Sequence, residues 1–362
     1  MDRWPKKIIL CVDNSELSNL SIDVAETLAS EFSSEIVGVH GYNAFMHEGA
    51  FRIMEPTLPE QYQREELLAR QRELHNKLIN IGMEKISLSY LRPLQERFGT
   101  KGIAFKPKVK EGKNFVALIQ MIEEEDADLI VLGNAGFNSN FRGFVGSVCL
   151  RILRRINQDF LVIKSAINFD EAPRIVVCLD GSLTSIGALE RAIKIAERTR
   201  SELHLVYVFD SKLHKDVFAR LKDAVLMKEG FRFNKKEQEK MHDEFIDIGL
   251  EKVGRMILDR AEKTVLSGNV ASKVAAVATL GYGPIGEPSG RPMIIKKILK
   301  GHIYRSICEY AEEIDAGLIC IGKTGRHYTD QIDLGSVCEN VVRFAHCSVL
   351  ISKHEGYRGW EL

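Results

Sequence analysis

Short apolar runs separated by longer amphipathic segments make up the hydrophobic pattern of the chain. The runs at 8–12, 36–39 and 129–132 do not alternate with polar residues, which is typical of parallel strands that are buried on both faces. The pattern predicts the order strand, helix, strand, long charged helix, strand, helix, strand, glycine-rich loop, helix and strand. This order predicts a doubly wound α/β domain, in which ligands bind at the carboxyl ends of the strands.

The whole pattern occurs twice. Asp13 in "CVDNS" corresponds to Asp180 in "CLDGS", 167 positions later, and the same offset pairs "INIGMEKI" at 79 with "IDIGLEKV" at 246. From Gly133, which pairs with Gly322, the offset is 189, so the second copy carries 22 extra residues, the difference between 189 and 167. We place them between about 265 and 292, where "GYGPIGEPSGRP" predicts a surface loop.

The repeat also sets the domain boundaries. We predict a first domain over 1–165, a linker over 166–173, a second domain over 174–354 and a tail over 355–362, because "SAINFDEAP" at 165–173 is polar and ends in proline. The last strands, 160–164 and 348–352, are short and apolar, and exposed edge strands are liabilities unless they are covered. We therefore expect the two domains to pack as an intramolecular pseudo-dimer through these strands. A homodimer of the tandem chain stays open.

Composition and charge exclude several classes of function. The 362 residues are 45% hydrophobic and 28% charged, and 50 Lys and Arg balance 50 Asp and Glu, so no basic field indicates a nucleic-acid partner. The start "MDRWPKKIIL" does not fit a signal peptide, and no apolar stretch approaches the ~20 residues of a membrane span. We expect a cytoplasmic protein with no membrane partner.

The seven cysteines recur with the repeat, so they do not indicate a disulfide framework. A metal site from Cys338, His346, Cys347 and His354 is disfavoured, because no C-x-x-C spacing is present. We expect no metal site in the protein itself.

Two nucleotide motifs are present only as strings. The stretch 317–324 spells G-x-x-x-x-G-K-T, but its four middle residues are apolar and predict a buried strand where a P-loop needs a turn. The stretch 281–286 spells G-x-G-x-x-G, but Pro284 and Pro288 argue against the helix that should follow. We interpret the second string as a plain turn.

A third glycine pattern, G-x2-G-x9-G-S, occurs in both copies at matched strand ends. Its members are Gly133, Gly136, Gly146 and Ser147 in the first copy, and Gly322, Gly325, Gly335 and Ser336 in the second. The first two glycines allow a sharp exit from the strand with a close backbone approach. The Gly-Ser pair opens the next helix, where the serine can cap and the free N–H groups attract phosphate. The alternative is a turn and a capped helix without a ligand.

These features resemble the universal stress protein family in its tandem-domain form. The resemblance rests on "CVDNS" and "CLDGS", on "ADLIVLG", on both glycine loops, and on the last strands "FLVIK" and "SVLIS". It implies two Rossmann-like domains similar to the adenine-nucleotide alpha-hydrolase fold.

The resemblance also implies a ligand, ATP or a related adenine nucleotide. In the second copy the carboxylates of Asp330 and Asp333 would repel a triphosphate unless Mg²⁺ accompanied it. Asp13 and Asp180 would hold the ribose and adenine end, and Gly41 and Val208 would contact the adenine. The phosphates would be wrapped by the glycines and serines above, together with Val148 and Val337, the residues that follow the serines.

Several plainer interpretations stand beside these. Asp13 and Asp180 could merely cap the helix that follows, a common role for Asp at a strand-to-helix turn, and Lys323 is an auxiliary charge at most. Cys149 and Cys338 occupy the place where many ATP-binding relatives have a hydroxyl residue. The copies also differ, since the first loop carries only Arg142, whereas the second carries Lys323 and Arg326 with Asp330 and Asp333.

The leading hypothesis is a stress-related, non-enzymatic nucleotide-binding regulator that unidentified protein partners recognise. A weak ATP hydrolase or adenylyl-transfer enzyme is the second hypothesis, although the chain lacks S-G-G-x-D-S and H-I-G-H strings and no catalytic trio recurs in both copies. The third is a ligand-free interaction module that uses the charged helices around 60–85 and 235–263.

Overall fold

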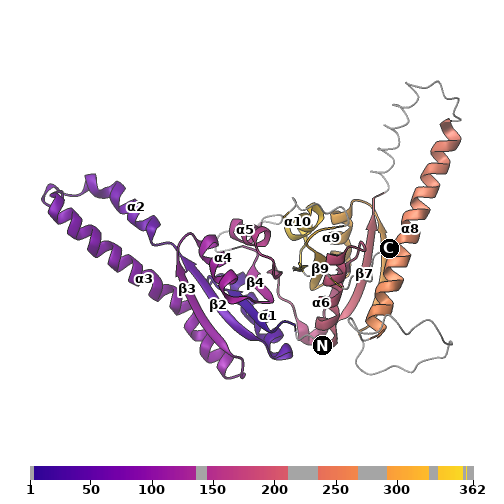
Figure 1. Ribbon diagram of the computed structural model, residues 1–362, viewed down its shortest axis with the longest axis horizontal. Helices are drawn as coiled ribbons and strands as arrows, with labels where there is room; N and C mark the ends of the chain where they lie inside the picture. The colour runs from indigo at the N-terminus through magenta and orange to yellow at the C-terminus, as the bar shows by residue number, and fades with distance from the viewer. Residues whose placement is uncertain are drawn as a thin grey trace. The chain divides into compact units, whose positions relative to one another are not determined.

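The computed structural model describes residues 4–135, 145–210, 235–267, 292–325, 333–353 and 356. The chain divides into two compact units, Asp2–Lys164 and Ser165–Leu362. Each unit contains a parallel sheet with helices packed on it (Figure 1). The stretch between the last strand of the first unit and the first strand of the second contains one short 3-10 helix, Phe169–Glu171.

The first unit has the predicted order of elements, with a further short helix and two 3-10 turns after its second strand. The elements are β1 (Lys7–Cys11), α1 (Glu16–Phe32), β2 (Glu35–Tyr42), α2 (Phe45–Met54), the 3-10 turns Glu55–Thr57 and Glu60–Tyr62, α3 (Glu65–Gly99), β3 (Phe105–Glu111), α4 (Asn114–Glu125), β4 (Leu129–Gly133), α5 (Ser147–Arg155) and β5 (Asp159–Ile163). The strands lie in the order β3-β2-β1-β4-β5, and all adjacent pairs are parallel.

The second unit repeats this plan. Its elements are β6 (Arg174–Cys178), α6 (Leu183–Thr199), β7 (Glu202–Phe209), α8 (Lys235–Ser267), β8 (Ile294–Lys300), α9 (Ile303–Glu313), β9 (Leu318–Gly322), α10 (Ser336–Phe344) and β10 (Ser348–Ser352). The strands lie in the order β8-β7-β6-β9-β10, again parallel throughout. The doubly wound fold class predicted from the sequence is confirmed in both copies.

The core of each unit lies on the central strands. Ile8, Ile9 and Leu10 of β1 are fully buried, as are Ile175 and Val176 of β6, which explains their unbroken apolar runs. From β1 the chain moves to β2 on one side, and β4 lies on the other side. The connections therefore diverge at the carboxyl ends of β1 and β4, and in the second unit at those of β6 and β9, which is where open α/β sheets bind ligands.

Most buried side chains of the long helix α3, and those described as buried in α8, lie in the second half of each helix. Leu91 and Phe98 of α3 are fully buried, and Leu258 and Val265 are their buried counterparts in α8. The first half of α3 projects past the sheet with α2 beside it (Figure 1), where the Phe51 ring stacks on His75 with centroids 4.4 Å apart. The projecting halves of these helices make few contacts with the sheet, which explains why their sequence is so highly charged.

The string at 317–324 is a strand, as predicted. Its residues Leu318–Gly322 form β9, and all five are buried. The helix α8 continues through Ser267, close to the predicted start of the extra residues at about 265. The rest of the predicted loop, including the string at 281–286, lies outside the described residues.

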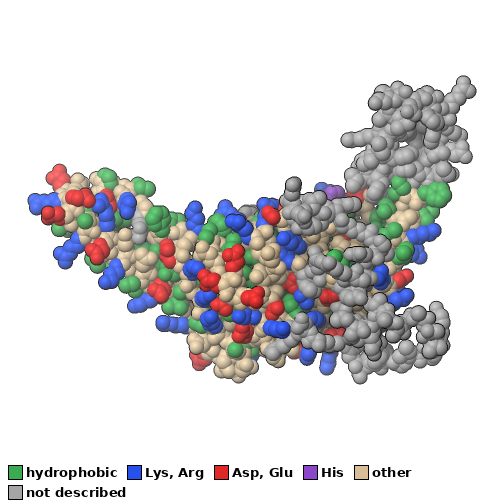
Figure 2. Space-filling model, in the orientation of Figure 1, with side chains coloured by type: hydrophobic (Ala, Val, Ile, Leu, Met, Phe, Trp, Pro, Cys, Tyr) green, Lys and Arg blue, Asp and Glu red, His purple; other side chains and the backbone are tan. Residues whose placement is uncertain are grey.

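The surface carries charges of both signs, as the balanced composition predicts. On the face shown in Figure 2, basic and acidic side chains are interspersed. None of the seven cysteines forms a disulfide, and all except Cys308 are buried. No helix in the described part of the chain is long and apolar enough to cross a bilayer.

Candidate functional site

An aspartate follows the first strand of each copy and orders the turn into the next helix. In the first copy, Asp13 is exposed and its Oδ1 accepts a hydrogen bond from the Ser15 N–H at 3.0 Å. The cap of α1 is Ser15, whose Oγ accepts from the Ser18 N–H at 3.2 Å. The interpretation of Asp13 as the helix cap is therefore wrong.

The second copy has the same geometry. Asp180 Oδ1 accepts from the Ser182 N–H at 2.9 Å, and Ser182 caps α6 by accepting from the Ser185 N–H at 3.2 Å. Asp180 is therefore not a cap either. In both copies a serine side chain caps the first turn of the helix. The aspartate lies two residues earlier, at the carboxyl edge of the sheet.

The glycine at the end of β4 packs closely against α1, and the glycine at the end of β9 packs closely against α6. A β-carbon at Gly322 would lie 2.5 Å from Thr184 Oγ1 and 2.7 Å from the Ser185 nitrogen. At Gly133 the nearest atom would be the Leu17 Cβ, at 3.0 Å. The close approach expected at these glycines is made by the first turn of α1 or α6, which brings the strand exit and the helix start together.

The next helix of each copy begins at a glycine. Gly146 and Gly335 are the N-caps of α5 and α10, and their N–H groups donate to the carbonyls of Asn134 and Lys323 at 2.8 and 2.9 Å. A β-carbon at Gly146 would lie 2.9 Å from the Asn134 oxygen, so a serine does not fit this place. Our prediction that the serine caps the helix is wrong.

Ser147 and Ser336 are instead the first residues of these helices and are exposed, and Val148 and Val337 after them are half-buried. Among the described residues, no side chain caps the first turn of either helix. The backbone N–H groups of that turn, which no intrahelical carbonyl can satisfy, are therefore not occupied by a side-chain cap.

In the second copy the structure brings Asp180 and the glycine loop together. A β-carbon at Gly325 would lie 2.9 Å from Asp180 Oδ2, so the carboxylate that follows β6 reaches the loop that follows β9. Gly136, the counterpart of Gly325, lies outside the described residues with the rest of 136–144, which includes Arg142. Arg326 and Asp330 also lie outside them.

Gly41 and Val208, expected to contact the adenine, are the next-to-last residues of β2 and β7. Val208 is half-buried, whereas Gly41 is buried and a β-carbon there would lie 3.1 Å from the Asn114 carbonyl oxygen of α4. Close packing against α4 therefore explains why position 41 is a glycine without any contact to a ligand.

The thiols behind the two helix starts are inert. Burial raises the pKa of Cys149 to about 12 and the pKa of Cys338 to about 12, although nearby lysines oppose the shift. A protonated thiol is a poor nucleophile, so these cysteines pack the first turns of α5 and α10.

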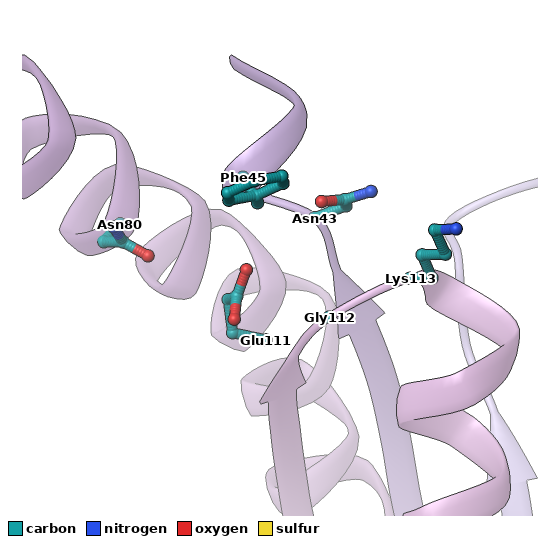
Figure 3. Close-up of a pocket in the computed structure, with 6 residues that line it drawn as sticks. All are labelled: Asn43, Phe45, Asn80, Glu111, Gly112 and Lys113. Carbon is teal, nitrogen blue, oxygen red and sulfur yellow. The ribbon is translucent and has the colours of Figure 1, made fainter. Parts of the chain in front are cut away.

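A hollow that sequence reasoning missed opens at the carboxyl ends of β2 and β3 in the first unit. It has a volume of about 380 Å³ and is lined by Asn43, Phe45, Asn80, Glu111, Gly112 and Lys113 (Figure 3). These residues come from α2, α3, the end of β3 and two loops, so no local sequence pattern could have indicated them. The hollow adjoins the end of β2, because its lining residue Asn43 is two residues after Gly41.

Comparisons with known proteins agree on one family. The chain matches the universal stress protein family over residues 5–164, 172–279 and 289–353. The universal stress protein MJ0531 of Methanocaldococcus jannaschii is 29% identical over 180 residues, which cover 50% of this chain and 81% of that protein.

Two solved structures resemble the chain along nearly its whole length. A functionally unknown protein of Pseudomonas aeruginosa, PA1789, has a TM-score of 0.58 and 13% identity, with 97% of this chain and 93% of that chain covered. A universal stress protein from Archaeoglobus fulgidus has a TM-score of 0.57 and 17% identity, with 96% and 98% covered. These likenesses show that the chain shares the fold of both proteins.

Proposed function

Because the chain belongs to the universal stress protein family, we propose that it is a stress-related, non-enzymatic regulatory protein that binds ATP or a related adenine nucleotide. The binding sites are the carboxyl ends of β1 and β4 in the first copy, and of β6 and β9 in the second. Bound nucleotide would bias the domains toward a state that protein partners recognise.

One observation supports the proposal most strongly, the glycine-capped helix start that faces the strand exits in each copy. No described residue caps the first turn of α5 or α10 with its side chain, and backbone N–H groups at a helix N-terminus attract phosphate. In the second copy the Asp180 carboxylate lies against the same loop, where it could accept hydrogen bonds from ribose hydroxyls. Mg²⁺ would enter with the phosphates of the nucleotide.

A second candidate function, an interaction module, is favoured by the projecting halves of α3 and α8. Leu78 and Ile81 are 62% and 43% exposed, and their counterparts Phe245 and Ile248 are 69% and 52% exposed. Exposed apolar side chains at the same positions of both copies fit a surface that binds other proteins. This candidate is compatible with nucleotide binding, and it stands alone if no nucleotide binds.

Mass spectrometry of the protein purified without added ligand tests the proposal. We expect an adenine nucleotide to accompany the chain, and Gly325→Val to reduce the nucleotide content, because its side chain would displace Asp180. Gly249→Val is the matched control, since a β-carbon at Gly249 meets nothing within 4 Å. An empty protein that also fails to bind millimolar ATP in calorimetry would overturn the proposal and leave the interaction module.

A further inference from the structure

The two candidate sites differ at three positions next to the strand exits. Thr184 in the first turn of α6 stands where the first copy has Leu17, and Lys323 and Thr324 stand where it has Asn134 and Ala135. Asn134 and Ala135 are buried, whereas Lys323 and Thr324 are half-exposed. The second copy thus presents polar and charged groups at places where the first copy is closed or apolar.

Thr184 ties the loop after β9 to α6. Its hydroxyl donates to the Thr324 carbonyl at 2.5 Å, and the Ser182 hydroxyl lies 3.4 Å from the same oxygen. Leu17 has no hydroxyl with which to make this bond.

The tie also sets the direction of the next backbone donor. The peptide between Thr324 and Gly325 is trans, as is every described peptide except Trp4-Pro5. A carbonyl that points at α6 therefore leaves the Gly325 N–H pointing away from α6. A loop that is already held in this way loses less conformational freedom when it binds a ligand.

The charged side chains near the helix start also favour phosphate binding in the second copy. Lys323 and Lys353 both lie near enough to Cys338, in the first turn of α10, to counter in part the burial that raises the pKa of this thiol to about 12. In the described part of the first copy, Lys164, the counterpart of Lys353, is the one lysine with this effect on the pKa of Cys149. The acidic neighbour Glu339 is held by Arg343, with nitrogen and oxygen 2.9 Å apart. Among the described residues, phosphates at the start of α10 would therefore lie near Lys323 and Lys353, with Asp333 two residues before the helix cap, whereas those at the start of α5 would lie near Lys164.

From these differences we infer that the two nucleotide sites are unequal, and that the second copy is the high-affinity site because Thr184 holds the strand exit at Thr324 and Lys323 adds a cation. This inference rests on the proposed function and identifies which copy carries it. The first copy keeps the glycine-capped helix but lacks both additions, so it binds the same nucleotide more weakly.

Calorimetric titration of the full chain with ATP and Mg²⁺ tests the inference. We expect one tight event per chain and a second event that is about tenfold weaker or more, because a charge-assisted contact and an ordering hydrogen bond are missing from the first copy. Ser336→Asp and Ser147→Asp are a matched pair, since both serines are exposed first residues of helices. An aspartate there suits the helix dipole and keeps the fold, but it repels phosphate.

Ser336→Asp should remove the tight event, and Ser147→Asp should remove only the weak one. Thr184→Val should weaken the tight event about fivefold, the effect of one hydrogen bond. The control is Thr27→Val, because the Thr27 hydroxyl only donates within α1, to the Asp23 carbonyl.

Other outcomes of the titration would contradict the inference in distinguishable ways. Two equal events, or loss of the tight event in Ser147→Asp, would overturn the inequality and leave nucleotide binding intact. A wild-type chain that gives no event with ATP would overturn both the inequality and the proposed function.

Discussion

His204 and Tyr310 form a buried polar pair in the second copy, where the first copy has Val37 and Met121 at the corresponding positions. His204 is 3% exposed, its Nδ1 lies 2.8 Å from the Tyr310 hydroxyl, and its Nε2 lies 3.4 Å from a carboxylate oxygen of Glu202. Burial lowers the pKa of His204, Arg174 lowers it further, and Glu202 opposes both. The fold therefore favours the neutral ring.

This residue should make stability depend on pH on the acidic side of neutrality. Above a pH of about 6.5, the ordinary pKa of histidine, His204 is neutral in both states and has no effect. As the pH falls below that value, the unfolded chain takes up a proton that the folded chain refuses, so the free energy of unfolding decreases until the pH passes the lowered pKa.

The double variant His204→Val with Tyr310→Met installs the pair of the first copy and should flatten this part of the profile. Urea unfolding of both proteins between pH 7.5 and 5 measures the difference. Equal losses of stability in the wild type and the variant over this range would contradict the assignment to His204.

At the scale of elements, the two copies join their first and long helices by different means. In the first copy the end of α3 is held to α1 by Arg97, which donates to both carboxylate oxygens of Glu26 at 3.1 and 2.8 Å and to Asp23 at 2.7 Å. Hydrogen bonding by Arg97 lowers the pKa of Glu26 despite its burial. In the second copy the counterparts of Arg97 and Glu26 are Thr264 and Ile193, so no ion pair can form at these two positions.

Arg97→Ala should lower the free energy of unfolding by about 1–2 kcal/mol, because it leaves the 9% exposed Glu26 carboxylate with Lys101 as its remaining cation. The value is at the low end for a buried pair, since Arg97 itself is 40% exposed and screened by solvent. Arg255→Ala removes an exposed pair with Glu251 on α8 and serves as the control, with no measurable change expected.

Acid should narrow the difference between wild type and Arg97→Ala. Glu26 has a folded pKa below its ordinary value of 4.5, so its contribution is present above that pH and is lost as the pH falls through the folded pKa. Urea unfolding at pH 7 and pH 3 gives both values. A difference that does not shrink at pH 3 would show that Arg97 acts through packing and not through charge.

At the scale of the whole molecule, we expect binding without efficient turnover. The groups proposed to hold the phosphates are mainly backbone N–H groups at helix starts, which stabilise the ground state and the transition state alike. Hydrolysis of ATP by the purified chain should therefore remain far below the ~1 to 10³ s⁻¹ of ordinary enzymes. Turnover of several per second that is abolished by Asp13→Ala together with Asp180→Ala would identify an enzyme instead.

Much of the fold could be predicted because it is written in local patterns. Apolar runs such as 8–12 have no polar face, so they predict strands buried on both sides, and the repeat offsets place the elements of one copy on those of the other. The helix α2 and its two 3-10 turns were missed, because the contacts that hold them are made with the projecting half of α3, which no local pattern records. The cap of α5 and α10 was misassigned by one residue, since only the crowded Asn134 carbonyl shows that glycine must occupy it.

The sequence by itself determined the duplication, the doubly wound order of elements and the glycines at the strand exits, because periodicity and spacing act along the chain. Only the tertiary structure decided what those residues touch. It placed Asp180 against Gly325 and Thr184 on the Thr324 carbonyl, and it grouped Arg97 with Glu26 and His204 with Tyr310. Each of these contacts joins residues about 70 to 145 positions apart in the chain, and such distances are closed by the packing of helices on the sheet, which no local pattern records.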